Sequence, residues 1–195
     1  TSWGTPVAID VIGSVGVFTS LQLVNGNPAI SYQDASTGDL KYVRALDPSG
    51  NSWGTPITID AQGYTGSHTT LLGVNGNPAI AYQNAGSVND LMYVRATDAS
   101  GVNWATPLLL DSAGLVGSHT SLHIINGNPA ISYWDMNNDL KYIRPSDASG
   151  NTWGTSIAVD VTGNVGSYTS LNVVNGNPAI SYMANSFGDL RYVRA

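Results

Sequence analysis

The sequence predicts an all-β fold in which four similar antiparallel sheets surround a central axis, which is a four-bladed β-propeller. One motif occurs four times, at intervals of about fifty residues. Each copy contains four short stretches typical of strands, separated by turn residues. Because glycines interrupt every window that would show a helical period, we expect no helix of useful length.

Three sequence elements define the repeats. Each copy carries a tryptophan, an Asn-Gly-Asn-Pro-Ala-Ile stretch and an Asp-Leu-x-Tyr-Val/Ile-Arg stretch. These elements begin at Trp3, Trp53, Trp104 and Trp153, at Asn25, Asn75, Asn126 and Asn175, and at Asp39, Asp90, Asp139 and Asp189. We therefore expect one propeller domain, residues 1–195, built from repeats at about residues 1–50, 51–101, 102–150 and 151–195.

The first copy shows the order of strands within a blade. The Asn-Gly pair at residues 25–26 is a strong hairpin signal, because both residues tolerate a positive φ. Pro28 stands at the start of the next strand, where a missing N–H does least harm. The expected strands are residues 19–24, 28–32, 40–44 and 56–60. Such a unit cannot bury its apolar face alone, so the copies must stack, and a ring of them is a propeller.

The chain begins and ends at different points of the repeat. Residues 3–10 have the sequence of a fourth strand, and residues 190–194 have that of a third strand. Pairing of these N- and C-terminal strands would complete the last blade and close the ring. The alternative is that two chains form one eight-bladed ring, so we expect either a monomer or a homodimer. The repeated tyrosines and tryptophans are expected to form the core between blades.

The composition limits the partners that the protein can have. The seven lysines and arginines are scattered singly and the net charge is −6, so we expect no nucleic-acid binding. The longest apolar runs are far below the roughly 20 residues that span a bilayer, so we expect no membrane partner. The absence of cysteine excludes disulfides and thiolate metal sites.

The origin of the protein is also suggested by composition. Lysine is scarce and glutamate is absent, which favours a bacterial protein that is extracellular or bound to the cell surface. The chain shows no signal peptide and does not begin with methionine, so we expect a mature or excised piece.

One turn resembles a motif of known propellers. The segment Asp47-Pro-Ser-Gly-Asn-Ser-Trp53 is similar to the Asp-box of sialidase-type propellers, with one extra residue between aspartate and glycine. Asp98 and Asp147 begin two further copies. In those families the box is structural, so the resemblance implies a fold and not catalysis. The blade size resembles that of four-bladed hemopexin-type propellers, while the kelch Gly-Gly and WD40 Trp-Asp signatures are missing.

The thirteen carboxylates, all aspartates, are the main test of an enzymatic function. Eleven of them occupy three repeated positions, which favours a structural role in turns. They are Asp10, Asp60, Asp111 and Asp160, then Asp39, Asp90, Asp139 and Asp189, and finally Asp47, Asp98 and Asp147. A glycosidase needs two carboxylates in different environments at one place. We therefore assign no catalytic residue.

The two remaining aspartates, Asp34 and Asp135, lie in the loop between the second and third strands. Their counterparts are Asn84 and Ala184, so the repeat does not require an acid there. In a closed ring the first and third blades are opposite, which would place both carboxylates across the axis as a catalytic pair or a cation site. The alternative is an ordinary solvated loop acid. Apart from a cation in this central channel, we expect no cofactor.

One repeated position is aromatic in every copy, as Phe18, His68, His119 and Tyr168. This pattern favours packing or ligand stacking over metal binding, because no two histidines have the local spacing of metal ligands. We expect no metal site.

The loops that differ most among the copies are those that enter the first strand and those that join the second and third strands. In a four-stranded meander both kinds of loop lie on one face. They carry Tyr64 and Trp134 among amides and hydroxyls with little charge, a combination that suits sugars. Neutral drift of an unconstrained face would give the same variation.

The sequence thus predicts a non-catalytic binding propeller, similar to propeller lectins, for a carbohydrate or another polar ligand. The predicted ligand-binding residues are Phe18, His68, His119, Tyr168, Tyr64, Trp134, Asp34 and Asp135. One alternative is a structural or protein-interaction scaffold. The other is a sialidase-like glycan hydrolase or lyase, for which the sequence offers no complete set of acid, base and nucleophile.

Overall fold

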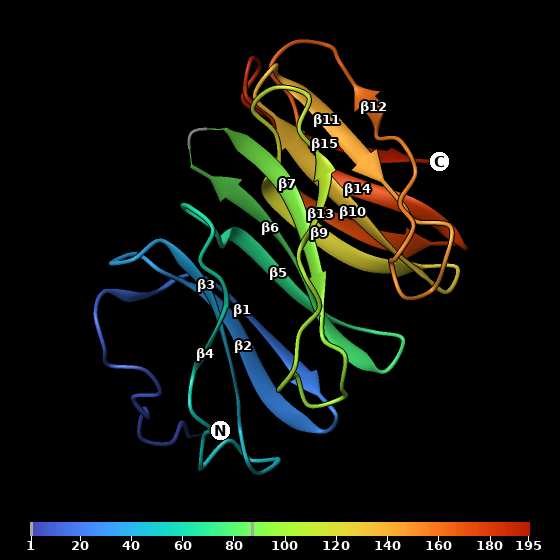
Figure 1. Ribbon diagram of the computed structural model, residues 1–195. Helices are drawn as coiled ribbons and strands as arrows, with labels where there is room; N and C mark the ends of the chain where they lie inside the picture. Colours follow the sequence, from blue (N-terminus) through green and yellow to red (C-terminus); the bar gives the residue numbers. More distant parts are fainter. Residues whose placement is uncertain (1, 87) are drawn as a thin grey trace.

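The computed structural model describes residues 2–86 and 88–195, which form four antiparallel sheets (Figure 1). Three sheets have four strands and the last has three, and in each the strands are adjacent in chain order. This is the predicted all-β arrangement of successive blades. Within the described range no helix is long and apolar enough to cross a membrane.

The first three strands of the first blade extend the predicted ones by one to four residues, and the fourth begins one residue later than predicted. The first blade consists of β1 (Val15–Val24), β2 (Asn27–Asp34), β3 (Asp39–Arg44) and β4 (Ile57–Asp60). The second consists of β5 (Ser67–Val74), β6 (Asn77–Ala85), β7 (Asn89–Arg95) and β8 (Leu108–Asp111). The third consists of β9 (Ser118–Ile125), β10 (Asn128–Asp135), β11 (Asp139–Ile143) and β12 (Ile157–Asp160). The last consists of β13 (Ser167–Val174), β14 (Asn177–Ala184) and β15 (Asp189–Arg194).

The hairpin between the first two strands of each blade has the conformation that the Asn-Gly pair predicts. Asn25 has a φ of 46° and Gly26 a φ of 79°, so both turn residues lie in the left-handed region. Val24 then pairs with Asn27 directly across the turn. The asparagines at the three equivalent turns, Asn75, Asn126 and Asn175, also have a positive φ.

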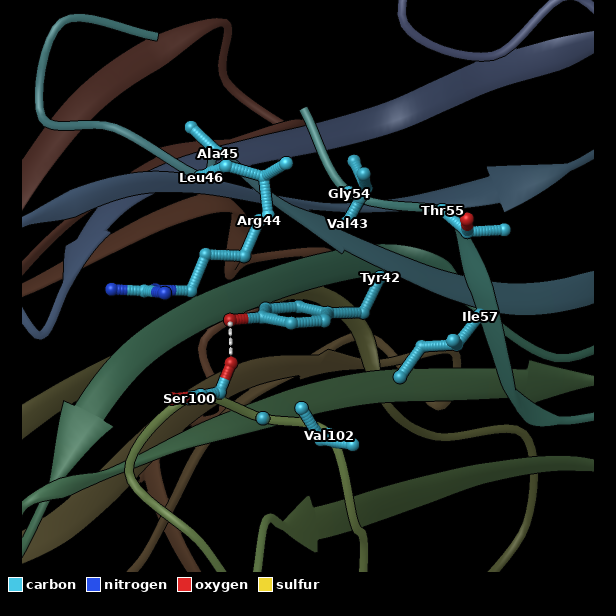
Figure 2. Close-up of a pocket in the computed structure, with 11 residues that line it drawn as sticks. Tyr42, Val43, Arg44, Ala45, Leu46, Gly54, Thr55, Ile57, Ser100 and Val102 are labelled. Atoms are coloured by element: carbon cyan, nitrogen blue, oxygen red, sulfur yellow. Dashed lines mark hydrogen bonds between the residues drawn. The ribbon is translucent and has the colours of Figure 1, made fainter. Parts of the chain in front are cut away.

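Successive blades are joined by a tyrosine of one blade and a turn of the next. The rings of Tyr42 on β3 and Trp104 after β7 meet edge-on, with centroids 5.1 Å apart. The Tyr42 hydroxyl donates a hydrogen bond to the carbonyl oxygen of Ser100 (3.1 Å; Figure 2). A Cβ on Gly101 would lie 2.8 Å from the Tyr42 ring, so only glycine allows this approach. The predicted core of tyrosines and tryptophans is formed between the inner blades, whereas Trp3 and Tyr192, near the two ends of the chain, are exposed.

The aspartate that begins each of these turns serves the turn itself. The Asp98 carboxylate accepts hydrogen bonds from the N–H groups of Ser100 (2.9 Å) and Asn103 (2.6 Å). The Trp104 indole N–H donates to the Gly101 carbonyl oxygen at 2.8 Å and fixes the ring. The turns that begin at Asp47 and Asp147 repeat this pattern. These aspartates are structural, as predicted.

A second contact ties the end of each fourth strand to the following blade. The Tyr82 hydroxyl on β6 donates to the Asp60 carboxylate at 2.6 Å. The same bond recurs as Tyr32 to Asp10 (2.7 Å), Tyr133 to Asp111 (2.5 Å) and Tyr182 to Asp160 (2.6 Å). Buried apolar side chains fill the space between the sheets, as in the cluster that combines Leu40 and Tyr42 of the first blade with Leu71 and Ile80 of the second.

The four blades form an array whose ring is not closed by strand pairing among the described residues. Among the described residues, β15 pairs only with β14, and residues 2–14 contain no strand. The first and last blades lie at opposite ends of the array (Figure 1). The pairing of N- and C-terminal strands is therefore not formed in this structure.

We predict that Trp104→Ala destabilises the protein, because it empties the contact between the first two blades. Trp104 is partly buried and packs against the cluster between these blades, and truncation of a large aromatic side chain in such a contact costs about 3 kcal/mol of the free energy of unfolding. Urea unfolding measures the loss. The control is Val102→Ala in the same turn, whose side chain is exposed and whose loss should stay within about 0.5 kcal/mol. Equal losses in both variants would contradict the role given to Trp104.

Candidate functional site

Four aromatic side chains, one from each blade, form a continuous row along the first strands. Neighbouring ring centroids lie 4.5 Å apart from Phe18 to His68, 4.5 Å from His68 to His119 and 4.3 Å from His119 to Tyr168. The row and the threonine that follows each ring line an open groove of about 360 Å³, here called the aromatic groove. The structure thus brings together four of the eight predicted ligand-binding residues.

A β-bulge puts each aromatic residue into the row. In β1, Val17 pairs with Gln33 and Ser20 with Ser31, so Phe18 and the next residue share a single partner on β2. The φ of Phe18 is 53°, a left-handed conformation that bulky residues rarely adopt. Bulges bend a strand and change the direction of a side chain. His68, His119 and Tyr168 have the same conformation, with φ of 53°, 53° and 55°.

Threonine hydroxyls of the next blade hold these strained residues in place. Thr69 donates to the Phe18 carbonyl oxygen at 3.2 Å, and Thr169 donates to the His119 carbonyl oxygen at 2.9 Å. Thr120 donates to the His68 carbonyl oxygen in the same way. A rare backbone conformation persists only where its surroundings determine it. The row is therefore set in position before any ligand arrives.

The aromatic groove carries no charge at neutral pH. Burial and the neighbouring His119 lower the pKa of His68 to about 4, and burial lowers the pKa of His119. Both imidazoles are therefore neutral. Over residues 2–86 and 88–195, no group of three or more histidine or acidic side chains could hold a metal ion. The chemistry of the groove is that of neutral ring faces and hydroxyls.

Trp134 extends the row from the side. Its ring centroid lies 6.0 Å from that of His119. It replaces the glutamines of the first two blades, of which Gln33 donates to the Thr65 carbonyl oxygen at 2.6 Å in the next blade. The buried indole N–H of Trp134 has no hydrogen-bond partner within the described part of the chain.

Tyr64 lies outside the aromatic groove. Its ring lies close to Gly38 of the first blade, where an added Cβ would come within 2.6 Å of the ring. The Tyr64 carbonyl oxygen accepts a hydrogen bond from the Ala85 N–H at 2.7 Å, which joins the loop entering β5 to the loop after β6. These two kinds of loop thus share one face, as predicted.

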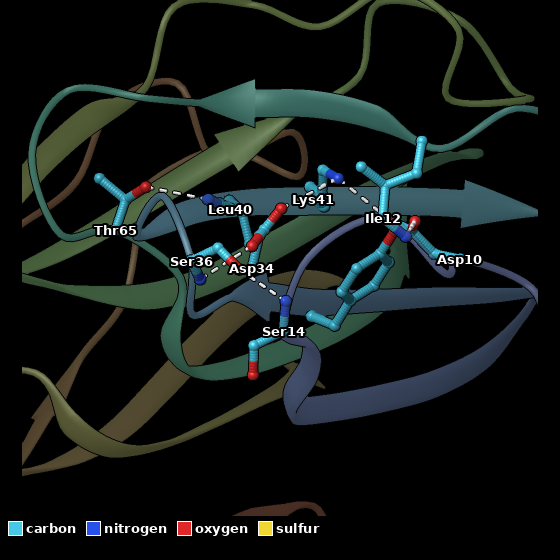
Figure 3. Close-up of polar contacts among 9 residues, drawn as sticks. Asp10, Ile12, Ser14, Asp34, Ser36, Leu40, Lys41 and Thr65 are labelled. Atoms are coloured by element: carbon cyan, nitrogen blue, oxygen red, sulfur yellow. Dashed lines mark hydrogen bonds and ion pairs between the residues drawn. The ribbon is translucent and has the colours of Figure 1, made fainter.

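Asp34 and Asp135 do not face each other across an axis. Each is buried in its own blade. Lys41 lies 3.2 Å from Asp34 (Figure 3), and Lys141 lies 2.7 Å from Asp135. Burial acts to raise the pKa of Asp34, but Lys41 and the N–H of Ser36 outweigh it and hold the pKa below its usual value. Neither carboxylate lines the aromatic groove.

The other two blades explain why these acids are optional. The second blade has Asn84 and Met92 in place of the aspartate and the lysine, so the charged pair is replaced as a unit. In the last blade Arg191 pairs with Asp160 at 3.1 Å instead. The sequence contained a signal for this ion pair, since a lysine on the third strand occurs only where the loop aspartate is present.

Asp90 differs from the other aspartates at its repeated position, and sequence reasoning did not single it out. Burial and the nearby Asp111 raise its pKa. For Asp111, burial acts to raise the pKa, but hydrogen bonds from Tyr133 and Ser156 and from the Ala113 N–H outweigh it and lower the pKa. One blade therefore holds two nearby carboxyl groups whose pKa values are displaced in opposite directions.

The backbone of Asp90 packs against the segment that enters β9, the strand that carries His119. A Cβ on Gly117 would lie 3.0 Å from the Asp90 carbonyl oxygen, and Gly117 is only two residues before His119.

We predict that His68 makes the protein less stable in mild acid. Its folded-state pKa of about 4 lies below the ordinary 6.5, so the unfolded chain binds more protons between these values. The free energy of unfolding should therefore fall as the pH drops through this window. His68→Phe, which copies the residue of the first blade, should reduce that fall. Urea unfolding at about pH 7.5 and about pH 4.5 measures it, and an unchanged pH dependence would refute the prediction.

We predict that Asp135→Asn destabilises the third blade by about 3 kcal/mol, because it leaves the charge of Lys141 without its closest partner. Adding Lys141→Met should recover most of this loss, since the double variant reproduces the Asn84 and Met92 pair of the second blade. Chemical denaturation of the two single variants and the double variant forms a complete cycle. Additive losses would show that the two side chains are not coupled.

The sequence matches no protein-family model, and no curated protein is similar to it. Solved structures are similar in fold. The endo-arabinanase of glycoside hydrolase family 43 from Bacillus licheniformis has a TM-score of 0.64 at 13% identity, over 96% of this chain and 74% of that one. The catalytic domain of the family 62 α-L-arabinofuranosidase from Coprinopsis cinerea has a TM-score of 0.60 at 15% identity, over 93% and 63%.

A carbohydrate-binding protein is similar to the same degree. The lectin of Aleuria aurantia, in complex with α-methyl-L-fucoside, has a TM-score of 0.60 at 13% identity, over 91% of this chain and 56% of the lectin. The chain thus spans about three quarters of the arabinanase and less than two thirds of the other two proteins. At these identities the likeness shows the fold.

These comparisons correct the predicted function. A non-catalytic, lectin-like protein without enzymatic activity was expected, but most of the structural neighbours are glycoside hydrolases, including further arabinofuranosidases and family 43 enzymes. The prediction of a binding module that is not an enzyme was therefore wrong. The hydrolases and the lectin among these neighbours are all carbohydrate proteins. The fold is that of a β-propeller.

Proposed function

We propose that the chain is a glycan hydrolase that holds a sugar ring against the aromatic groove. The observation that carries this proposal is the row of four rings from Phe18 to Tyr168, spaced 4.3–4.5 Å apart and fixed by β-bulges. Ligand sites are typically concave and apolar, with a few polar groups that set orientation. The groove of about 360 Å³ has this character, with ring faces for C–H groups and threonines beside them.

The shape of the groove favours a glycan chain over a single small sugar. It runs across all four blades and is open to solvent along its length. Tyr168 at one end is 70% exposed, and Phe18 at the other end is also exposed. A chain of sugars can therefore lie along the row, with successive rings on successive aromatic side chains. The hydrolases among the structural neighbours include an arabinanase and a xylanase, which supports polysaccharides as the substrate class.

Hydrolysis of a glycoside needs one protonated and one ionised carboxyl group. Asp90 and Asp111 have the required opposite displacements of pKa, and such pairs mark acid and base in known sites. In the proposal Asp90 protonates the leaving oxygen of the glycosidic bond, and Asp111 takes the proton of the attacking water. The bond to the leaving group breaks, a bond to water oxygen forms, and both products gain hydroxyl groups.

We predict that Tyr168→Ala weakens glycan binding about tenfold, because one stacking surface is lost. Isothermal titration with soluble arabinan and xylan oligosaccharides measures the affinity. Leu109→Ala is the matched control, since Leu109 is an exposed residue of β8 outside the groove. Equal affinities of the Tyr168 and Leu109 variants would show that the aromatic groove does not bind the glycan.

We predict that the protein releases reducing sugars from arabinan or xylan and that Asp90→Asn lowers the rate at least a hundredfold, the usual contribution of a general acid. Asp39→Asn is the matched control, because Asp39 occupies the same repeated position in the first blade and should leave the rate unchanged. Binding without release of sugar from either polysaccharide would overturn the proposed hydrolase. Equal rates of the two variants would exclude Asp90 as the acid.

A further inference from the structure

The first and last blades expose the surfaces that the inner blades press together. Leu21 on β1 is 64% exposed, whereas its counterpart Leu71 on β5 is 0% exposed. Leu190 on β15 is 85% exposed, whereas its counterpart Leu40 on β3 is 0% exposed. Leu40 and Leu71 belong to one cluster between the first two blades. The two ends of the chain therefore carry the two halves of one contact.

A hollow in the first blade matches Leu190. Between the first two blades, Leu40 packs so closely on Gly66 that a Cβ there would lie 2.9 Å from the Leu40 Cα atom. The equivalent Gly16 has no such neighbour within 4 Å. It lies in a hollow of about 180 Å³ lined in part by Tyr32. The position of this hollow in the first blade is the one that Leu40 contacts in the second blade, and the counterpart of Leu40 in the last blade is Leu190.

A cleft between the third and last blades matches a tryptophan. Trp104 packs against the cluster between the first two blades that includes Tyr42, Ile57, Ile59, Ile80 and Val94. The counterparts of these residues line an apolar cleft of about 200 Å³, which is formed by Tyr142, Ile157, Val159, Ile180 and Val193 together with Pro178. A tryptophan equivalent to Trp104 would occupy this cleft.

The N-terminal segment, residues 3–10, has the sequence of a fourth strand preceded by such a tryptophan. Residues 3–10 are identical to residues 53–60 at six of eight positions. In the structure they form no strand, and Trp3 is 97% exposed. At the other end of the array, β15 is paired on one side only. An open strand edge readily accepts an added strand.

Residues 3–10 are held at the first blade, so they can pair only with the last blade of another copy. Asp10 is bound to the first blade by the Tyr32 hydroxyl at 2.7 Å and by Lys41 at 3.1 Å. This repeats the tie between Asp60 and Tyr82, so the segment lies where a preceding blade would end. The last blade of the same chain lies at the far end of the array (Figure 1).

We propose that two copies of the chain associate head to tail through these surfaces. Residues 3–10 of one copy add to β15 of the other as the fourth strand of its last blade. Trp3 then enters the cleft beside Tyr142, and Leu190 enters the hollow at Gly16. The contact joins two different surfaces, so copies can close into a ring or extend as a chain. Two copies that close a ring give eight blades.

Sedimentation velocity and native mass spectrometry of the 195-residue chain test the association. The wild type should have at least twice the mass of 20.4 kDa, and dilution should release the monomer. Trp3→Ala and Leu190→Asp should each be mainly monomeric, with an unchanged far-UV circular dichroism spectrum because both side chains are exposed in the single chain. Leu109→Asp on β8 is the matched control and should assemble like the wild type.

Mixing the two variants distinguishes head-to-tail association from other modes. Trp3→Ala retains an intact last blade, and Leu190→Asp retains an intact N-terminal segment, so one complete contact can form between them. The mixture should yield a heterodimer that neither variant gives alone. A wild type that stays a monomer at all concentrations, whether open or closed on itself, overturns the proposal. So does a Leu190→Asp variant that assembles as well as the wild type.

Discussion

The contact between successive blades is the constraint on which the rest of this structure depends. A single blade has two faces and can cover neither by itself, which is why Leu71 is fully buried and its counterpart Leu21 is not. The hydroxyl of Tyr82 on Asp60 and the ring of Trp104 on Tyr42 fix one blade against the next. Because every copy carries the same residues, the same angle is repeated, and this angle determines the curvature of the array.

The aromatic groove is a consequence of this repetition. In an isolated blade, Phe18 would be one strained aromatic residue on a bulged strand. The inter-blade contact brings the next bulge within stacking distance, and Thr69 of that blade binds the Phe18 carbonyl oxygen. Four weak recognition elements thereby become one continuous surface. The electrostatics agree with the proposed binding of a neutral sugar, since burial keeps the pKa of His68 and His119 low and the row neutral.

The sequence was sufficient for local structure and for features that recur in every copy. The Asn25-Gly26 pair determines a hairpin because few residues tolerate its φ values, and alignment of the copies located the aromatic position. The bulge at that position was not predicted, since a register shift depends on the paired strand. The angle between blades is a sum of many packing contacts and has no sequence pattern, so the sequence alone does not determine whether four blades close. The expected opposition of Asp34 and Asp135 depended on that closure and is not formed in this structure.

The open ends and the aromatic groove are physically connected. In the proposed association, the first blade of one copy follows the last blade of another, as the second blade follows the first within the chain. Phe18 of one copy would then stand beside Tyr168 of the other. These two rings would stack as Phe18 and His68 do on successive blades of one chain. The exposed ends of the row would become its middle, and the strand that completes the last blade would also lengthen the groove. Assembly and glycan binding would therefore favour each other, because a ligand that spans the junction contacts both copies and stabilises their contact.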